Sequence, residues 1–548
     1  MNMRSAIPAE APEYAAPDAL RNALVTSALP GEIDGLDDGE LDRIVAFLID
    51  STAQRIPGTP AISIKSQGAN AAGERRMMLA VINDDMPFLV DSIAQTISAH
   101  GIDSHRLLHP VVAVRRDGEG RLTRILPQGS SGERHESIVY LELDRVDARV
   151  RRQLESQLRT VLAGVRAAVR DWSRMQAALQ DDADRLPDGE GAALLRWFLD
   201  RNFTQLGHHV EARDGTYSAP LGILAVDDGT LWSSGERNAA FAWFEGGAEA
   251  PLIVKSHRIA TVHRHVPLDL LVVPLREAGE IVALSVHAGL WTSAALRAPS
   301  DKVPVLRARL ATIESKYGFD PQGHAGKALH HALASLPHDL LIAFDTASLE
   351  RLALGAMSLA DRRRPRLMLI PSALRRHLFA FVWLPRDEVS TARRRTIGEL
   401  LSRAANAPLD GWAMELGDGD LALIRFTFHL PLDATIPDAE QLDRQIAAML
   451  RGWSTAVETT LAELLPPTRA TRLAISYANA FPLSYRERYG SREAAYDIRR
   501  LSMLSGPDAR GARLYRIDED DGDRLRLKLY RADGLMPLSA AVPVLENF

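Results

Sequence analysis

Three histidines lie close together in the sequence, and their imidazole side chains could bind a metal ion. They are His257, His263 and His265, and alternation along a strand would put His263 and His265 on one face, where two imidazoles could hold a metal ion. No carboxylate stands at a suitable near spacing, and an exposed polar face explains these histidines equally well. The adjacent pairs at 208–209 and 330–331 have side chains that diverge. We therefore predict no metal site in this chain.

A nucleotide site would need a glycine-rich turn between a strand and a helix, because a pyrophosphate must approach the backbone at the helix N-terminus. The chain has no GxGxxG motif in that context. The segment GHAGK at 323–327 lacks the spacing of the first glycine and the Ser or Thr after the lysine, so a helix start with Gly326 is the better interpretation. We predict neither catalytic residues nor a bound cofactor.

The composition limits the function classes further. A chain of 548 residues is too long for one hydrophobic core, and three or four domains are expected. Its net charge of −6 gives no reason to expect nucleic acid as a partner, and the arginine runs at 362–364 and 393–395 are typical of solvated surfaces. Because the chain has no cysteine, disulfides and thiolate metal sites are excluded.

The N-terminal region carries no targeting signal. Residues 1–40 mix Ala, Pro, Asp and Glu with little periodicity, which predicts a flexible leader. The chain has no signal-peptide core and no run of roughly 18 apolar residues that could cross a membrane. We expect a cytoplasmic protein with no membrane partner.

The elements that must position any site begin with an α+β unit at 41–175. Strand patterns at 77–84, 107–114 and 137–144 are joined by an amphipathic helix at 89–100 and followed by another at 150–169. The order strand, helix, strand, strand, helix is that of ferredoxin-like domains, in which two helices cover one face of an antiparallel sheet.

The same order returns at 363–465, which we interpret as a diverged internal repeat. Between the copies, residues 190–300 carry short strand patterns without long helices between them, and they predict a mixed α+β module of a sensory (PAS-like) type. Residues 301–362 predict a helical connector, with helices near 304–317, 325–336 and 346–360, and residues 466–522 a linker with helices.

The last segment, 523–548, predicts the start of a third, truncated unit. Leu525, Leu527 and Leu529 alternate with basic residues along a strand, and a helix pattern then begins at PLSAAVPVLENF. One strand and the beginning of one helix cannot bury their own apolar faces, so we expect missing partner elements.

Several of these segments resemble the large-type NAD-specific glutamate dehydrogenases of bacteria. The resemblance runs from about residue 40 to the last residue, through NDDMPFLVDSIAQTISAHGI, LLRWFLDRNFTQLG, GLWTSAAL, GFDPQGHAGKALHHALASLPHDLL, VWLPRD and LRLKLYRADGLMPLSAAVPVLENF. It implies a much longer parent polypeptide whose ACT-like domains precede the dehydrogenase domain. The parent would oxidise L-glutamate to 2-oxoglutarate and ammonia with NAD, and the implied role of this segment is assembly into a homo-oligomer and allosteric control.

ACT-like units commonly bind an amino acid where the first strand turns into the first helix. In this sequence that turn contains Asp84, Asp85 and Pro87, with Asp91 on the first helical turn, and the helix N-terminus could receive a ligand carboxylate. Ligand-binding ACT domains usually have a glycine after the proline, whereas this chain has Phe88, whose bulk would fill the ligand space. Two hypotheses stay open for this unit: a structural or oligomerising domain, and an effector site for an amino acid. A free-standing amino-acid sensor is the alternative to an enzyme segment.

Overall fold

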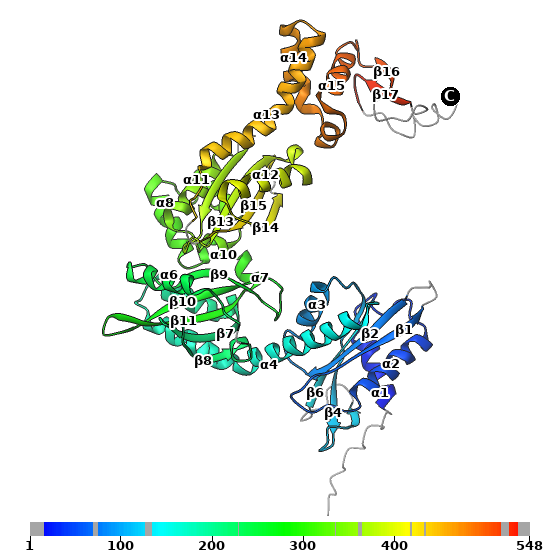
Figure 1. The fold of residues 1–548 in the computed structure, drawn as a ribbon, viewed down its shortest axis with the longest axis vertical. Helices are drawn as coiled ribbons and strands as arrows, with labels where there is room; N and C mark the ends of the chain where they lie inside the picture. Colours follow the sequence, from blue (N-terminus) through cyan, green and yellow to red (C-terminus); the bar gives the residue numbers. More distant parts are fainter. Residues whose placement is uncertain are drawn as a thin grey trace, which may run out of the picture. The chain divides into compact units, whose positions relative to one another are not determined.

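The computed structural model describes residues 16–69, 75–126, 134–227, 229–334, 336–359, 364–416, 419–431, 434–516 and 525–534 (Figure 1). The chain forms two compact units. The first contains residues up to 311 together with 338–343, and the second contains 312–337 and the residues from 344 onward. The segment predicted as a helical connector, 301–362, contributes residues to both units.

The first unit begins with an antiparallel sheet and its helices. The elements are α1 (Ala16–Ser27), α2 (Asp38–Thr52), β1 (Ala61–Ala69), β2 (Arg75–Asp84), α3 (Leu89–Ala99), β3 (Ser104–Leu108), β4 (Val111–Arg116), β5 (Leu122–Leu126), β6 (Arg134–Asp144) and α4 (Ala148–Arg185). The strand order is β1-β2-β6-β4-β5, and β3 also pairs with β6. The predicted antiparallel α+β class is confirmed.

The sheet of this first repeat is covered on both faces, because β2 and β6 are apolar at nearly every position. Met78, Ala80 and Ile82 pack against α1 and α2. The alternate residues Met77, Leu79 and Val81 point to the opposite face and are also buried. The prediction of a flexible leader over 1–40 is wrong from residue 16 onward, since Leu20 and Leu24 of α1 are fully buried in this core. The Ala- and Asp-rich composition hid a short amphipathic helix that packing stabilises.

The second unit contains a sheet with a similar but shorter order of elements, in which one strand follows the first helix where the first repeat has β3, β4 and β5. They are β12 (Arg366–Pro371), β13 (His377–Pro385), α12 (Thr391–Ala405), β14 (Leu409–Leu416), β15 (Leu421–His429) and α13 (Ala439–Leu464), with the strand order β12-β13-β15-β14. In both repeats an edge strand, β1 or β12, precedes the strand where the sequence pattern was expected to start. The five-element order was thus incomplete, because each repeat has an additional edge strand at its start.

The middle module of the first unit is a five-stranded antiparallel sheet of order β8-β7-β11-β10-β9. Its elements are α5 (Glu190–Trp197), β7 (Phe203–Ala212), β8 (Tyr217–Gly222), α6 (Ser234–Glu245), β9 (Leu252–Ile259), β10 (Pro267–Glu277) and β11 (Glu280–Trp291). The expectation of no long helix between these strands is wrong, because α6 lies between β8 and β9. A capping box of Ser233 and Glu236 starts this helix.

Helices lie in the segments predicted to be helical: α8 (Leu306–Tyr317), α9 (His324–Ala334), α11 (Thr346–Met357), α14 (Pro467–Tyr477) and α15 (Leu483–Leu501). Two short helices, α7 (Ser293–Arg297) and α10 (His338–Leu341), were not predicted individually. Gly326 is buried in the first turn of α9, where an added Cβ would lie 2.2 Å from the carbonyl oxygen of Asp320. This close packing explains the glycine of GHAGK without a phosphate. None of the described helices combines the length and the apolar character that a membrane crossing requires.

A hairpin of β16 (Arg510–Tyr515) and β17 (Arg526–Arg531) ends the described part of the chain. β16 lies inside the segment 466–522, which was predicted as a linker. The third α+β unit, predicted to start at residue 523, therefore begins earlier, at β16. Leu525, Leu527 and Leu529, which the alternation placed on one face, are exposed, and Leu514 of β16 is exposed as well. The helix predicted after residue 537 lies outside the described residues.

Candidate functional site

The four residues of the predicted effector site surround the turn between β2 and α3. Asp84 ends β2, and its carboxylate contacts Arg55, accepts a hydrogen bond of 2.6 Å from Arg166 and another of 3.1 Å from the backbone N–H of Gly58. Burial opposes ionisation of Asp84, but Arg166 and Arg55 outweigh it and lower the pKa of this carboxyl group. Its negative charge is thus neutralised by the protein itself.

The other acidic residues of this turn point to different partners. Asp85 accepts a hydrogen bond of 2.7 Å from the hydroxyl of Ser137, and Asp91 lies 2.9 Å from Nδ1 of His263. Pro87 is exposed in the turn. The structure therefore brings the four residues together around one turn, but each of the three carboxylates is bound by different protein groups.

Phe88 is held in a left-handed backbone conformation, with φ of 71°, and its ring contacts the ring of His263 at a centroid distance of 5.2 Å. The loop at 260–266, between β9 and β10, carries His263 onto this turn, where the backbone N–H of His263 donates a hydrogen bond to Ser92. The turn of the first repeat is consequently a contact surface with the middle module.

A chain of alternating charges lies beneath the same turn. Arg55 is almost completely buried and contacts both Asp84 and Glu136, and Arg116 makes two hydrogen bonds of 2.8 Å to Glu136. Burial nevertheless outweighs the attraction of Glu136 and Asp84, and it lowers the pKa of Arg55 from its usual value. No sequence pattern pointed to these arginines, because they come from separate segments of the chain.

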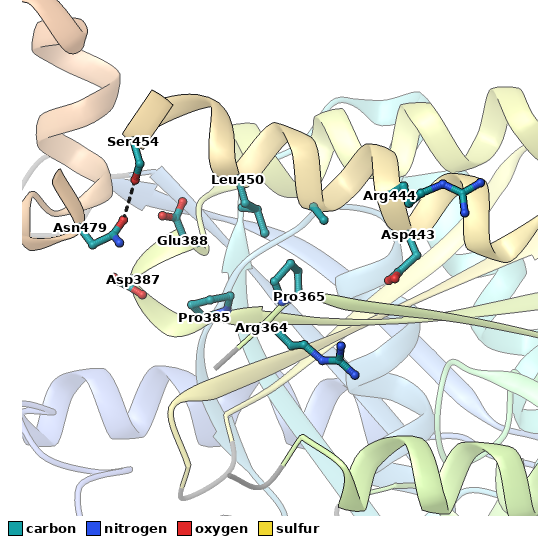
Figure 2. A pocket seen from close by; sticks show the side chains of 11 residues that line it. Arg364, Pro365, Pro385, Asp387, Glu388, Asp443, Arg444, Leu450, Ser454 and Asn479 are labelled. Atoms are coloured by element: carbon teal, nitrogen blue, oxygen red, sulfur yellow. Dashed lines mark hydrogen bonds between the residues drawn. The ribbon is translucent and has the colours of Figure 1, made fainter. Parts of the chain in front are cut away.

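The equivalent turn of the second repeat borders a cavity of about 560 Å³ (Figure 2). The cavity is lined by Arg364, Pro365, Pro385, Asp387, Glu388, Asp443, Arg444, Ala447, Leu450, Ser454 and Asn479. The turn supplies Pro385 to Glu388, α13 supplies the residues from Asp443 to Ser454, and Asn479 comes from the segment after α14. A volume of this size accommodates a small organic ligand.

Charges of both signs line this cavity. Arg364 and Arg444 are the basic residues, and Asp387, Glu388 and Asp443 the acidic ones. This mixture suits a zwitterion, because a carboxylate can pair with a guanidinium while an ammonium group pairs with a carboxylate. Arg364 belongs to the arginine run that the sequence indicated as a solvated surface, and the other two residues of that run lie outside the described part.

Some of these side chains are held by neighbours in the second unit. Glu388 contacts Arg393 and the buried Arg486, and one oxygen of Asp443 accepts a hydrogen bond of 2.6 Å from the backbone N–H of Leu367. The hydroxyl of Ser454 donates to Asn479 over 3.0 Å, as the dashed line in Figure 2 shows. The cavity walls are therefore positioned before any ligand arrives.

The middle module contains a buried polar cluster that the sequence patterns did not predict. His287 Nε2 donates to Asp182 over 2.7 Å, and Ser285 Oγ lies 3.0 Å from Nε2 of His208. Burial, together with the nearby His287, lowers the pKa of His208 to about 3, so this imidazole is neutral at neutral pH. His208 and His287 are register partners on β7 and β11, a pairing that no local sequence pattern reveals.

The histidines that the sequence singled out do not form a common site. His257 lies 2.9 Å from Glu236, whereas His263 pairs with Asp91. Among the described residues, the group with metal-ligand geometry is instead Asp182, His208 and His287.

Comparison with known proteins assigns most of the chain to one set of domains. Models described as glutamate dehydrogenase domains match in order: ACT1 at residues 22–158, helical motif 1 at 303–362, ACT2 at 366–454, helical motif 2 at 460–504 and ACT3 at 510–548.

Three similar proteins are each named NAD-specific glutamate dehydrogenase. That of Halomonas elongata is 29% identical over 499 residues, which cover 86% of this chain and 31% of the relative. That of Pseudomonas aeruginosa is 28% identical, with 85% and 30% covered, and that of Mycobacterium tuberculosis is 23% identical, with 86% and 30% covered. The chain thus spans about a third of the length of these relatives.

Proposed function

This chain belongs to the family of large NAD-specific glutamate dehydrogenases, and we propose that it is the N-terminal regulatory and assembly segment of such an enzyme. The parent reaction would be the oxidation of L-glutamate by NAD to 2-oxoglutarate, ammonia and NADH. The hydride transfer to the nicotinamide would take place in a domain that this segment does not include.

One structural observation carries this proposal. Every pairing between the strands β1 to β17 that the structure describes is antiparallel. A dinucleotide fold needs parallel strands joined by helices, with a glycine-rich turn at the helix N-terminus. The antiparallel pairing of the described strands therefore favours a role in packing and contacts over dinucleotide binding.

The direct test is an assay of NADH formation by the purified chain with L-glutamate and NAD. We expect no turnover, whereas the full-length enzyme prepared in parallel should be active. Measurable turnover by the chain alone would contradict the assignment. Extending the reading frame beyond Phe548 separates the enzyme segment from a free-standing amino-acid sensor, because only the former is followed by a dehydrogenase domain.

The cavity of the second repeat favours allosteric control by an amino acid. Basic and acidic residues are among those that line its space of about 560 Å³, whereas the turn of the first repeat is contacted by the middle module. Calorimetric titration with a panel of amino acids tests this hypothesis. Binding heat whose affinity weakens when Arg444 is replaced by Gln supports it, and no heat with any amino acid contradicts it.

Self-association is the other part of the proposal. The edge strand β14 exposes Trp412, Met414 and Leu416, each between 42% and 62% accessible, and an apolar edge of this kind favours pairing with another chain. Sedimentation analysis should show a homo-oligomer that the replacement Met414→Lys dissociates. A wild-type chain that sediments as a monomer would contradict the proposed role of this edge in self-association.

A further inference from the structure

The buried cluster of the middle module has the composition and placement of a metal centre. Asp182 lies near the end of α4, His208 on β7 and His287 on β11. All three are at most 5% exposed, and one ligand atom from each lies within 4.8 Å of the others. We propose that these three side chains bind a divalent transition-metal ion of the zinc type.

The geometry suits a small ion with nitrogen and oxygen ligands. Ligand atoms around a tetrahedral zinc ion lie about 3.3 Å apart. Ser285 Oγ lies 3.0 Å from His208 Nε2 and 3.3 Å from His287 Nε2, so its hydroxyl stands at the fourth position. The distance of 2.7 Å between His287 Nε2 and Asp182 must lengthen by about half an ångström to admit the ion.

The ligand types point to zinc or a neighbouring transition metal. Two imidazoles and one carboxylate are typical of this group, whereas calcium and magnesium prefer all-oxygen sites. The two histidines and the carboxylate leave one positive charge on the complex with a divalent ion. Arg185, whose guanidinium donates to the other oxygen of Asp182 over 2.6 Å, is 58% exposed at its side chain and so adds little repulsion.

Groups around the cluster resemble the supporting shell of a metal site. Gln205 Nε2 lies 2.8 Å from Nδ1 of His287, and Gln176 donates to Gln205 over 3.1 Å. When His287 binds the metal through Nε2, its imidazole proton moves to Nδ1. The amide of Gln205 then turns so that its oxygen accepts from Nδ1–H, and the amide of Gln176 turns so that its oxygen accepts from Gln205. The imidazole stays neutral, so the step needs no external acid or base.

The ion would join two parts of the first unit. α4 belongs to the first repeat, and its last turns reach the sheet of the middle module, where Asp182 lies against β11. A bound ion would hold this end of the helix to β7 and β11 together. The rival account is a hydrogen-bond network that keeps the same groups satisfied without a metal.

The experiment uses the intact chain after removal of any polyhistidine tag and dialysis against a chelator. Titration with Co²⁺ should give the visible absorption of a four-coordinate ion that saturates at one equivalent, and Zn²⁺ should abolish it. The melting temperature should rise with added Zn²⁺. No saturable uptake at one equivalent would overturn the proposal in favour of the hydrogen-bond network.

Variants locate the ion. Asp182→Asn keeps the shape of the side chain and should weaken metal affinity by at least about a hundredfold, as should His208→Gln. His209→Gln is the matched control, because this neighbour lies near Glu211 and outside the cluster, and it should bind Co²⁺ as the wild type does. If His208→Gln fails to fold, Asp182→Asn decides, and undiminished uptake by a folded variant would contradict the assignment.

Discussion

The first and second repeats place the same turn in two different surroundings. In the first repeat, the turn after β2 is contacted by the loop that carries His263, and its Asp84 is paired with Arg55 and Arg166. In the second repeat, the turn after β13 borders a cavity of about 560 Å³. The repeated order of strands and helices thus specifies where a site can form, and the neighbouring elements decide whether space remains for a ligand.

The backbone of the two turns differs accordingly. The first turn ends at Phe88 with φ of 71°, a conformation that is costly for a bulky residue and is held by the surrounding contacts. The second turn forms a short helix from Arg386 to Glu388 and leads to an N-cap at Ser390 with an extended backbone. A strained, packed turn suits domain contact, whereas a relaxed turn beside a cavity suits binding.

The largest expected effect concerns the wall of the cavity. Glu388→Gln removes the counter-charge of Arg486, which is 4% exposed, and leaves a buried guanidinium unpaired. We expect a loss of about 3 kcal/mol in the free energy of unfolding of the second unit, measured by denaturant titration. Glu440→Gln, at an exposed pair with Arg444, should change the stability little. If both variants lost the same free energy of unfolding, the burial of the ion pair would not explain its contribution to stability.

The next effect concerns the ion pairs of the first turn. Asp84→Asn should destabilise the first unit by about 2 kcal/mol at neutral pH, since two charged hydrogen-bond donors lose their anion. The pKa of Asp84 is lowered in the folded state, so its contribution is present above the unfolded value of about 3.9 and is lost as the pH falls further. The difference between wild type and variant should shrink below about pH 4 in acid unfolding curves. A constant difference down to lower pH would contradict this role.

A smaller effect is expected for binding at the open turn. Arg444→Gln should weaken amino-acid affinity about tenfold, the cost of one charge-assisted hydrogen bond to a carboxylate. Isothermal titration compares this variant with Arg472→Gln, whose side chain lies outside the cavity lining. Affinity that is equal in the two variants would place the ligand elsewhere.

The smallest effect sharpens the contact that closes the first turn. Phe88→Ala and His263→Ala should each destabilise the first unit, and the double variant should show a coupling of about 0.5–1 kcal/mol for the ring pair. Chemical denaturation of the four proteins measures it. If the two single losses of unfolding free energy simply add up in the double variant, the contact between the rings does not contribute to stability.

Much of the architecture followed from local patterns, while single sites did not. The apolar spacing of Leu89, Ile93 and Ile97 predicted α3, and all three residues are buried. The apolar spacing did not reveal α1, where alanines dilute the apolar stripe, and the pattern also missed the edge strands β1 and β12. Asp84 and Asp91 were found from the turn, but their partners Arg55 and His263 come from distant segments.

The sequence by itself determined the antiparallel α+β class, the repeated unit and the alternating leucines of the last strand, because apolar periodicity is set by backbone geometry that each segment adopts locally. Only the tertiary structure decided that one turn is packed and the other borders a cavity, and that His208 meets His287 beside Asp182. These contacts depend on the register between β7 and β11 and on the path of α4. Both are set by residues far apart in the chain, so no local pattern predicts them.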